Sequence, residues 1–154
     1  MKKIIKFIIS IIITQAAGLI GSFFTIDSVN NWYPELNKPF FTPPNWVFGP
    51  VWTILYLLLG ISFYLVWKTD KTNKTSAYVL FFIQLFLNVS WSILFFGLRS
   101  PFLGLLEIII LIGAIGATII RFFRTFKLSA YLLVPYFLWV CFAAVLNLSI
   151  YLLN

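Results

Sequence analysis

The sequence predicts an all-α membrane protein, a bundle of five transmembrane helices that forms one domain over residues 1–154. The chain is 62% hydrophobic and 10% charged, whereas soluble domains are typically about half apolar and about a quarter charged. Five apolar stretches reach the roughly 20 residues that a helix needs to cross the hydrocarbon core. Basic residues cluster between these stretches, as they do at the cytoplasmic ends of membrane helices.

The predicted spans cover residues 7–26, 46–67, 76–98, 102–123 and 129–152, and a long outer loop covers residues 27–45. Each span must be helical, because lipid offers no partner for an unpaired backbone N–H or C=O group. The apolar runs are continuous rather than alternating, which argues against a membrane β-barrel.

The first span could instead be a signal peptide, since Lys2, Lys3 and Lys6 precede an apolar run that leads to small residues at 16–18. The apolar run continues through residues 23–26, which is too long for a typical signal sequence. We therefore expect a membrane span here.

Local signals mark the ends of the later spans. Ser100 followed by Pro101 predicts an N-cap and the first residue of the fourth helix. Ser129 is expected to cap the fifth helix, and Pro135 is expected to bend it.

The distribution of cations predicts the orientation in the membrane. If the N-terminus is cytoplasmic, nine cations fall inside and two outside. This bias predicts a cytoplasmic N-terminus and an external C-terminus, in a multi-pass protein of the bacterial cytoplasmic membrane. The inner cations are Lys2, Lys3, Lys6, Lys68, Lys71, Lys74, Arg121, Arg124 and Lys127, and the outer ones are Lys38 and Arg99.

The loop at 27–45 has two interpretations. Its prolines restrict the backbone, and a long, stiff, aromatic loop is often a lid or a binding loop. Alternatively, it is a linker that rests on the lipid headgroups, with Trp32 and Tyr33 in the interfacial aromatic belt. The prolines are Pro34, Pro39, Pro43 and Pro44.

Several polar side chains lie at membrane depth. Gln84, Asn88 and Ser92 share one face of the third span, and Asn147 lies in the fifth. They could form hydrogen bonds between helices, or they could orient a ligand in an apolar pocket. Glu107, the only acid inside a span, could snorkel or bond a neighbour, or it could face the mouth of a pocket.

Large aromatic residues on the second and fifth spans suggest a flat slot, and the alternative is ordinary packing. On the second span they lie near one face with Gly60 among them, and on the fifth Trp139 is followed by Ala143 and Asn147 at spacings of four. Trp46 and Trp67 could equally be interfacial anchors. The aromatic residues of the second span are Trp52, Tyr56, Phe63 and Trp67.

The composition excludes several kinds of site. Histidine is absent and Cys141 is the single cysteine, which argues against most zinc, copper and haem sites and excludes a disulfide within the chain. No Gly-rich phosphate loop or Ser/His/Asp set is visible. We expect no metal, no required cofactor and no classical enzyme. The cations lie in short clusters between apolar runs, so nucleic acid is not an expected partner.

A further signal lies in three segments, WYPELNKPFFTPPNWVFGPVWTILY, QLFLNVSWSILFFG and PYFLWVCFAAVLNLSIYLLN. These segments resemble the TspO/MBR family, also called tryptophan-rich sensory proteins, whose animal relative is the mitochondrial translocator protein or peripheral-type benzodiazepine receptor. The resemblance implies a five-helix bundle, usually a homodimer, with a pocket that opens toward the first loop. It also implies binding of porphyrins such as protoporphyrin IX, of haem, of isoquinoline or benzodiazepine drugs and, in some members, of sterols.

The resemblance also implies roles for particular residues. Trp52 and Trp139 match tryptophans proposed in some members to support light- and oxygen-dependent porphyrin breakdown, so they would be the catalytic pair if this chain degrades porphyrin. A sterol motif of the fifth helix is incomplete, because no basic residue follows Tyr151. The implied ligand-binding residues are Tyr33, Trp52, Tyr56, Asn88, Phe95, Trp139 and Ala143, and the implied loop lid consists of Trp32, Pro43, Pro44 and Trp46.

Together these features predict a membrane receptor for protoporphyrin IX and related flat lipophilic molecules, which acts in tetrapyrrole handling or stress sensing. The alternatives are light-dependent porphyrin degradation and passive transport of porphyrins or other lipophiles. Expected partners are the bilayer, the porphyrin and a second copy of the chain. We expect the porphyrin carboxylates near Lys38, Asn30, Asn31 and Asn37, and a preference for metal-free porphyrin over haem.

Overall fold

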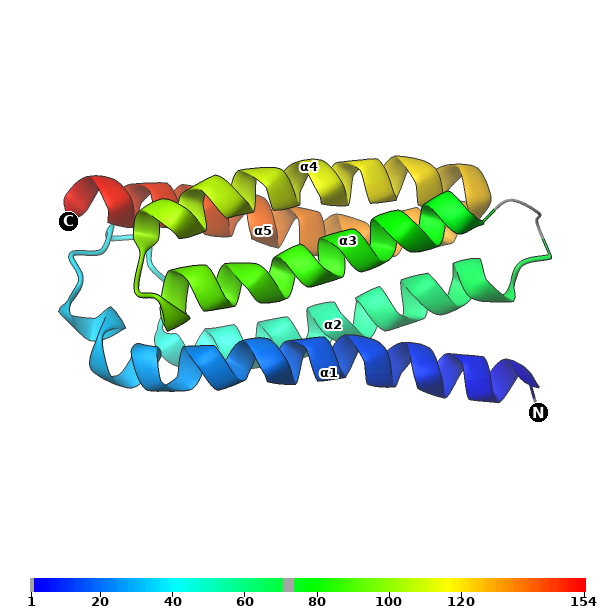
Figure 1. Cartoon of the computed structure of the whole chain (residues 1–154), viewed down its shortest axis with the longest axis horizontal. Helices are drawn as coiled ribbons and strands as arrows, with labels where there is room; N and C mark the ends of the chain where they lie inside the picture. Colours follow the sequence, from blue (N-terminus) through cyan, green and yellow to red (C-terminus); the bar gives the residue numbers. More distant parts are fainter. Residues whose placement is uncertain (1, 71–73) are drawn as a thin grey trace.

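The computed structural model describes residues 2–70 and 74–154, and every regular element in those residues is a helix. Five of the helices are long and apolar enough to cross a membrane, so the predicted fold class is confirmed. Lys71, one of the predicted inner cations, lies outside the described residues. The long elements are α1 (Lys2–Asn31), α2 (Asn45–Lys68), α3 (Thr75–Ser92), α4 (Pro101–Thr125) and α5 (Lys127–Leu153) (Figure 1).

Two short elements complete the chain. The 3-10 helix η1 (Tyr33–Glu35) lies in the loop after α1, and the π-helical turn η2 (Ile93–Gly97) extends α3. The five long helices run lengthwise beside one another, and the two termini lie at opposite ends of the bundle (Figure 1). We call the end that carries η1 and the C-terminus the loop end.

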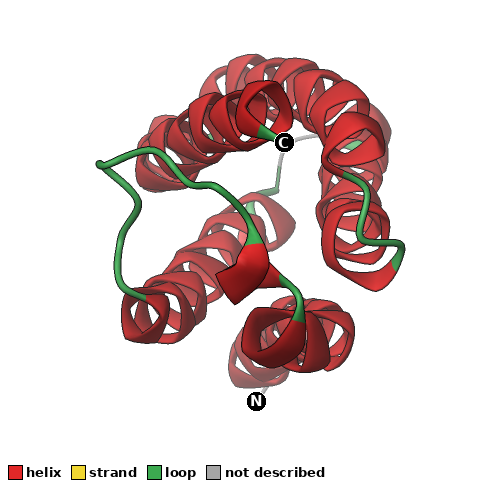
Figure 2. Cartoon of the chain, turned by 90° about the vertical axis from the view of Figure 1, so that its left-hand side faces the viewer, coloured by secondary structure: helices red, strands yellow, loops and turns green. Residues whose placement is uncertain are grey.

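The helices form a closed ring in the order α1, α2, α5, α4, α3 when the bundle is viewed from the loop end (Figure 2). Consecutive helices α1 and α2, α3 and α4, and α4 and α5 pack as antiparallel pairs, and contacts of α2 with α5 and of α1 with α3 close the ring. This order places α4 on the side of the bundle away from α1 and α2.

α1 is longer than the predicted span of 7–26. It continues to Asn31, because polar side chains sustain the last turn: Asn31 Nδ2 donates to Asp27 Oδ1 at 2.7 Å, and Asp27 pairs with Arg99 at 3.2 Å. The apolar pattern indicates where lipid ends, whereas the helix ends where its backbone hydrogen bonds end.

The predicted caps had different outcomes. Ser100 caps α4 as predicted, because its hydroxyl accepts from the Leu103 N–H at 3.3 Å. Ser129 is not the cap of α5, which begins at Lys127 after Phe126. Buried Ser129 instead donates to the Phe126 carbonyl at 2.6 Å. α5 continues without interruption through Pro135.

The half of the bundle farther from the loop end is solidly packed. Phe63 stacks on Phe81 with ring centres 4.5 Å apart, and Phe81 stacks on Phe122 at 5.9 Å. Phe63 therefore belongs to the core, the partly buried Trp67 packs against it with ring centres 5.7 Å apart, and neither residue lines a slot. The prediction that Gly60 lies in an aromatic slot on the second span was wrong, because Gly60 does not border the cavity.

Gly60 allows α1 to approach α2 closely. A Cβ atom at Gly60 would lie 2.7 Å from the Ile11 side chain, 2.8 Å from the Thr14 hydroxyl and 3.1 Å from the Ile11 backbone. A glycine at this crossing lets the two backbones meet, as small residues commonly do between membrane helices.

Candidate functional site

A cavity of about 390 Å³ lies at the loop end of the bundle. Its lining comes from α1, η1, α2, α3, η2 and α5, and among the described residues α4 contributes none. The volume is at the lower end of the range of small-molecule pockets.

A chain of hydrogen bonds crosses the bundle where the cavity meets the core. The Tyr56 hydroxyl donates to Asn88 Oδ1, Asn88 Nδ2 donates to the Tyr136 hydroxyl at 3.0 Å, and that hydroxyl donates to Gln84 Oε1 at 2.9 Å. All four residues are buried, and they tie α2, α3 and α5 together. Gln84 and Asn88 thus form hydrogen bonds between helices, and Asn88 and Tyr56 also border the cavity.

Three indoles from three helices form the aromatic walls. Trp52 of α2 lies 5.6 Å from the Tyr56 ring, and Trp139 of α5 lies 6.1 Å from the Phe48 ring. Trp91 of α3 stacks on Phe95 at 5.2 Å with an angle of 19° between the ring planes. All six rings border the cavity, so the walls are made of aromatic surfaces.

Hydrogen bonding holds one of these indoles in place. Trp91 Nε1 donates to Asn147 Oδ1 at 3.2 Å, and Asn147 Nδ2 donates to the Pro101 carbonyl at 2.8 Å. Asn147 is buried, so both bonds satisfy polar atoms that would otherwise be costly in the membrane. The amide therefore links α3, α4 and α5 beside the cavity.

Small residues shape the cavity. A Cβ atom at Gly18 would lie 2.6 Å from the Tyr56 ring, and one at Gly21 would lie 3.1 Å from the Ser92 hydroxyl. These glycines bring α1 against α2 and α3, and the short Ala143 side chain leaves space on the α5 side.

Tyr33 forms the cavity wall nearest the loop. Its side chain is 3% exposed and its ring lies 5.8 Å from that of Phe96. Burial raises the pKa of the Tyr33 hydroxyl to about 12. The hydroxyl is therefore neutral at physiological pH, and it can donate a hydrogen bond to a ligand.

Lys38 is not available as the expected partner of ligand carboxylates. Its ammonium group donates to the carbonyls of Tyr33, Pro34 and Leu36 at 2.8, 3.2 and 3.0 Å, and it lies 5.0 Å from the centre of the Tyr33 ring. The three donors of the ammonium group are thus used to hold the η1 turn.

Two of the expected loop asparagines are also engaged elsewhere. Asn31 bonds Asp27. Asn37 bonds the C-terminus: its N–H donates to Asn154 Oδ1 at 3.0 Å, and Asn154 Nδ2 returns a bond to the Asn37 carbonyl at 3.0 Å. Asn30 does border the cavity, together with Asn45 at the start of α2.

The structure brings the seven expected ligand-binding residues together around this one cavity. The expected lid residues do not border it: Trp32 packs 5.7 Å from Phe95, and Trp46 is 76% exposed. The seven are Tyr33, Trp52, Tyr56, Asn88, Phe95, Trp139 and Ala143, and the lid residues are Trp32, Pro43, Pro44 and Trp46.

The sequence did not predict that α1 lines the cavity. Its small and polar residues recur every three or four positions, which indicates a helix face, but nothing in the sequence distinguishes a cavity wall from a packing surface. The α1 residues that border the cavity are Gln15, Gly18, Leu19, Gly21, Ser22, Thr25, Ile26, Val29 and Asn30.

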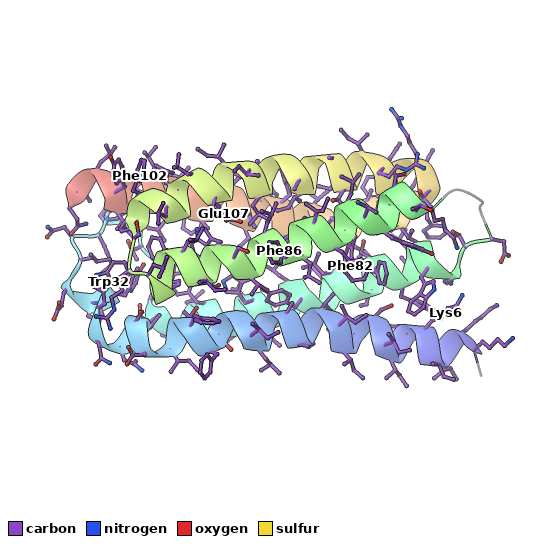
Figure 3. All side chains as sticks on the ribbon, viewed as in Figure 1. Lys6, Trp32, Phe82, Phe86, Phe102 and Glu107 are labelled. Carbon is purple, nitrogen blue, oxygen red and sulfur yellow. The ribbon has the colours of Figure 1, made fainter. Side chains whose placement is uncertain are left out.

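Glu107 does not take either of its expected roles. Its side chain lies on the inner side of α4 (Figure 3), is 7% exposed and does not border the cavity. Neither carboxyl oxygen has a hydrogen-bond partner among the described residues. Glu107 therefore neither snorkels nor faces the pocket mouth.

Comparison with known proteins decides the family. The model of the TspO/MBR family matches residues 10–153. The chain belongs to the TspO/MBR family. Relatives support this assignment over nearly the full length. The tryptophan-rich proteins TspO of Archaeoglobus fulgidus and Chlorobaculum tepidum are 50% and 42% identical to it, and the alignments cover 98–99% of each chain.

The human translocator protein is 38% identical over 135 residues, which are 86% of this chain and 80% of the human protein. As a TspO/MBR protein with five apolar spans, the chain is a multi-pass integral membrane protein with a sensory or binding role.

Proposed function

We propose that this TspO/MBR protein binds protoporphyrin IX and related flat, lipophilic tetrapyrroles in the cavity at the loop end, and that it acts in tetrapyrrole handling or stress sensing. The observation that carries the proposal is that Trp52, Trp91 and Trp139, from three different helices, border the same cavity. Broad π surfaces on several sides suit a planar aromatic ring, which gains from stacked or edge-to-face contacts.

The polar groups around the cavity suit a ligand with one polar edge. Asn30 and Asn45 border the cavity at the loop end, where they can donate hydrogen bonds to carboxylates. Deeper in the cavity, Tyr56 and Asn88 are bonded to each other, so the amphiphilic ligand would place its ring there and its carboxylates toward the loop.

The lack of histidine favours metal-free porphyrin. The usual protein ligands of haem iron are His, Cys, Met and Tyr. Cys141 does not border the cavity, and Tyr33 and Tyr56 border it as buried phenols. We therefore expect a lower affinity for haem than for protoporphyrin IX.

The test is a titration of the purified protein in nanodiscs with protoporphyrin IX, followed by quenching of tryptophan fluorescence. Replacing both Trp52→Phe and Trp139→Phe should weaken the affinity about tenfold, since each indole contributes on the order of 0.5–1.5 kcal/mol of ring contact. Trp46→Phe is the matched control, because Trp46 is exposed and does not border the cavity. An unchanged affinity in the double variant would exclude this cavity as the binding site.

A further inference from the structure

The cavity reaches the surface of the bundle along the seam between α1 and α2. Leu19 and Ile26 of α1 border the cavity and are nevertheless 72% and 62% exposed. Gly49 and Thr53 of α2 likewise border it and are exposed. These residues lie within the membrane spans, so the opening faces lipid.

The seam changes character along its length. Toward the bundle centre the helices meet closely at Gly18 and Gly60. Beyond that point a Cβ atom at Gly49 would meet no side chain or neighbouring element within 4 Å. The described residues show a single hydrogen bond between α1 and α2, from Gln15 Nε2 to the Thr53 carbonyl at 3.2 Å. The seam is therefore an apolar slit that is closed at its inner end and held by one polar contact.

The other possible entrance to the cavity, through the loop at the loop end, is held closed by more hydrogen bonds. Asn37 and the C-terminus share three hydrogen bonds, including one from Asn37 Nδ2 to the Leu153 carbonyl at 3.3 Å. In addition, the Ser28 hydroxyl donates to the Phe96 carbonyl at 2.6 Å and holds the end of α1 against η2. A ligand that entered from water along the bundle axis would have to displace these contacts.

From this contrast we infer that the slit between α1 and α2 is the ligand portal, through which a flat amphiphile passes edge first from the lipid leaflet at the loop end into the cavity. The inference rests on the proposed function and adds the route and the source of the ligand. The slit is apolar beside Leu19, Ile26 and Gly49 and polar at its loop end, where Asn30 and Asn45 lie. A tetrapyrrole dissolved in the leaflet has the same arrangement, because its ring lies among acyl chains and its carboxylates lie at the headgroups.

The test measures rates as well as affinity. Protein in nanodiscs is mixed rapidly with protoporphyrin IX, and release is followed after addition of excess empty vesicles. In Gly49→Phe the new ring would stand in the slit, and both association and release should slow about tenfold. The matched control is Gly113→Phe on α4, where a Cβ atom also meets nothing within 4 Å and which does not border the cavity. Its rates should equal those of the unmodified protein.

Two further variants keep the test decisive. Leu19→Trp, on the exposed rim of the slit, should also slow both rates. It is the second slit variant and replaces Gly49→Phe in the test if Gly49→Phe does not fold. Asn154→Ala loosens the loop without touching the slit and should leave the rates unchanged. Faster binding in Asn154→Ala, or unchanged rates in both slit variants, would overturn the portal. Absence of equilibrium quenching in the unmodified protein would instead refute the proposed function.

Discussion

Asn88 holds together the deepest part of the cavity, and its replacement by leucine should destabilise the bundle. Asn88 accepts from the Tyr56 hydroxyl and donates to the Tyr136 hydroxyl at 3.0 Å. Asn88→Leu has a similar size but makes neither bond. Tyr136 keeps its bond to Gln84 at 2.9 Å, whereas the buried Tyr56 hydroxyl loses the only acceptor that it has among the described residues.

The magnitude follows from these contacts. Hydrogen bonds between membrane helices average about 0.6 kcal/mol each, so two lost bonds cost about 1.2 kcal/mol. A buried hydroxyl left without a partner costs a further 1 kcal/mol or so. We expect Asn88→Leu to lower the free energy of unfolding by about 2 kcal/mol and Tyr56→Phe to lower it by about 1 kcal/mol. The double variant should be less destabilised than their sum, by about 0.6 kcal/mol or more, because the two residues share one bond.

The free energy of unfolding can be measured by steric trapping in bicelles or by titration with SDS in mixed micelles. Ser90→Ala is the matched control on the same helix, since the exposed Ser90 hydroxyl donates only to the Phe86 carbonyl of its own helix, at 3.0 Å. Strict additivity of Asn88→Leu and Tyr56→Phe, or a stability of Asn88→Leu equal to that of Ser90→Ala, would refute the hydrogen-bonded chain described here.

Two other predictions concern helix packing and the loop. Gly60→Ala should lower the free energy of unfolding by about 1–3 kcal/mol, because its Cβ atom would lie 3.1 Å from the Ile11 backbone. Gly113→Ala is the control and should leave the free energy of unfolding unchanged, since a Cβ atom there meets nothing within 4 Å. The same unfolding assay measures both variants. The pKa of the Tyr33 hydroxyl is about 12 in the folded protein and about 10 in the unfolded chain. The contribution of this hydroxyl to the free energy of unfolding is therefore complete below pH 10 and is lost as the pH rises toward 12. In that window the free energy of unfolding of the unmodified protein should fall more steeply with pH than that of Tyr33→Phe, and parallel pH profiles would show that Tyr33 is not buried.

The amino-acid sequence by itself determined the membrane class and the number of spans. Runs of about 20 apolar residues have only one stable form in lipid, since a helix alone satisfies the backbone within a single segment. The resemblance to the TspO/MBR family then placed seven residues at one site, and the structure arranges them around one cavity.

Only the tertiary structure decided how particular side chains are used. Gly60 and Gly18 are both small residues on apolar helices, yet Gly60 is buried where α1 and α2 cross and Gly18 lies at the cavity wall. Lys38 carries the charge that a carboxylate ligand needs, but nearby carbonyls of its own turn use its three donors.

The physical reason is that periodicity indicates which face of a helix a residue occupies, but not which helix lies opposite. α1 became a cavity wall because it packs against both α2 and α3, and the slit exists because α1 and α2 meet at glycines toward the bundle centre but not beside Gly49. These distances between helices depend on the packing of the whole ring. The composition of each span therefore determined that it crosses the membrane, and the packing of the spans against one another determined where the bundle is hollow.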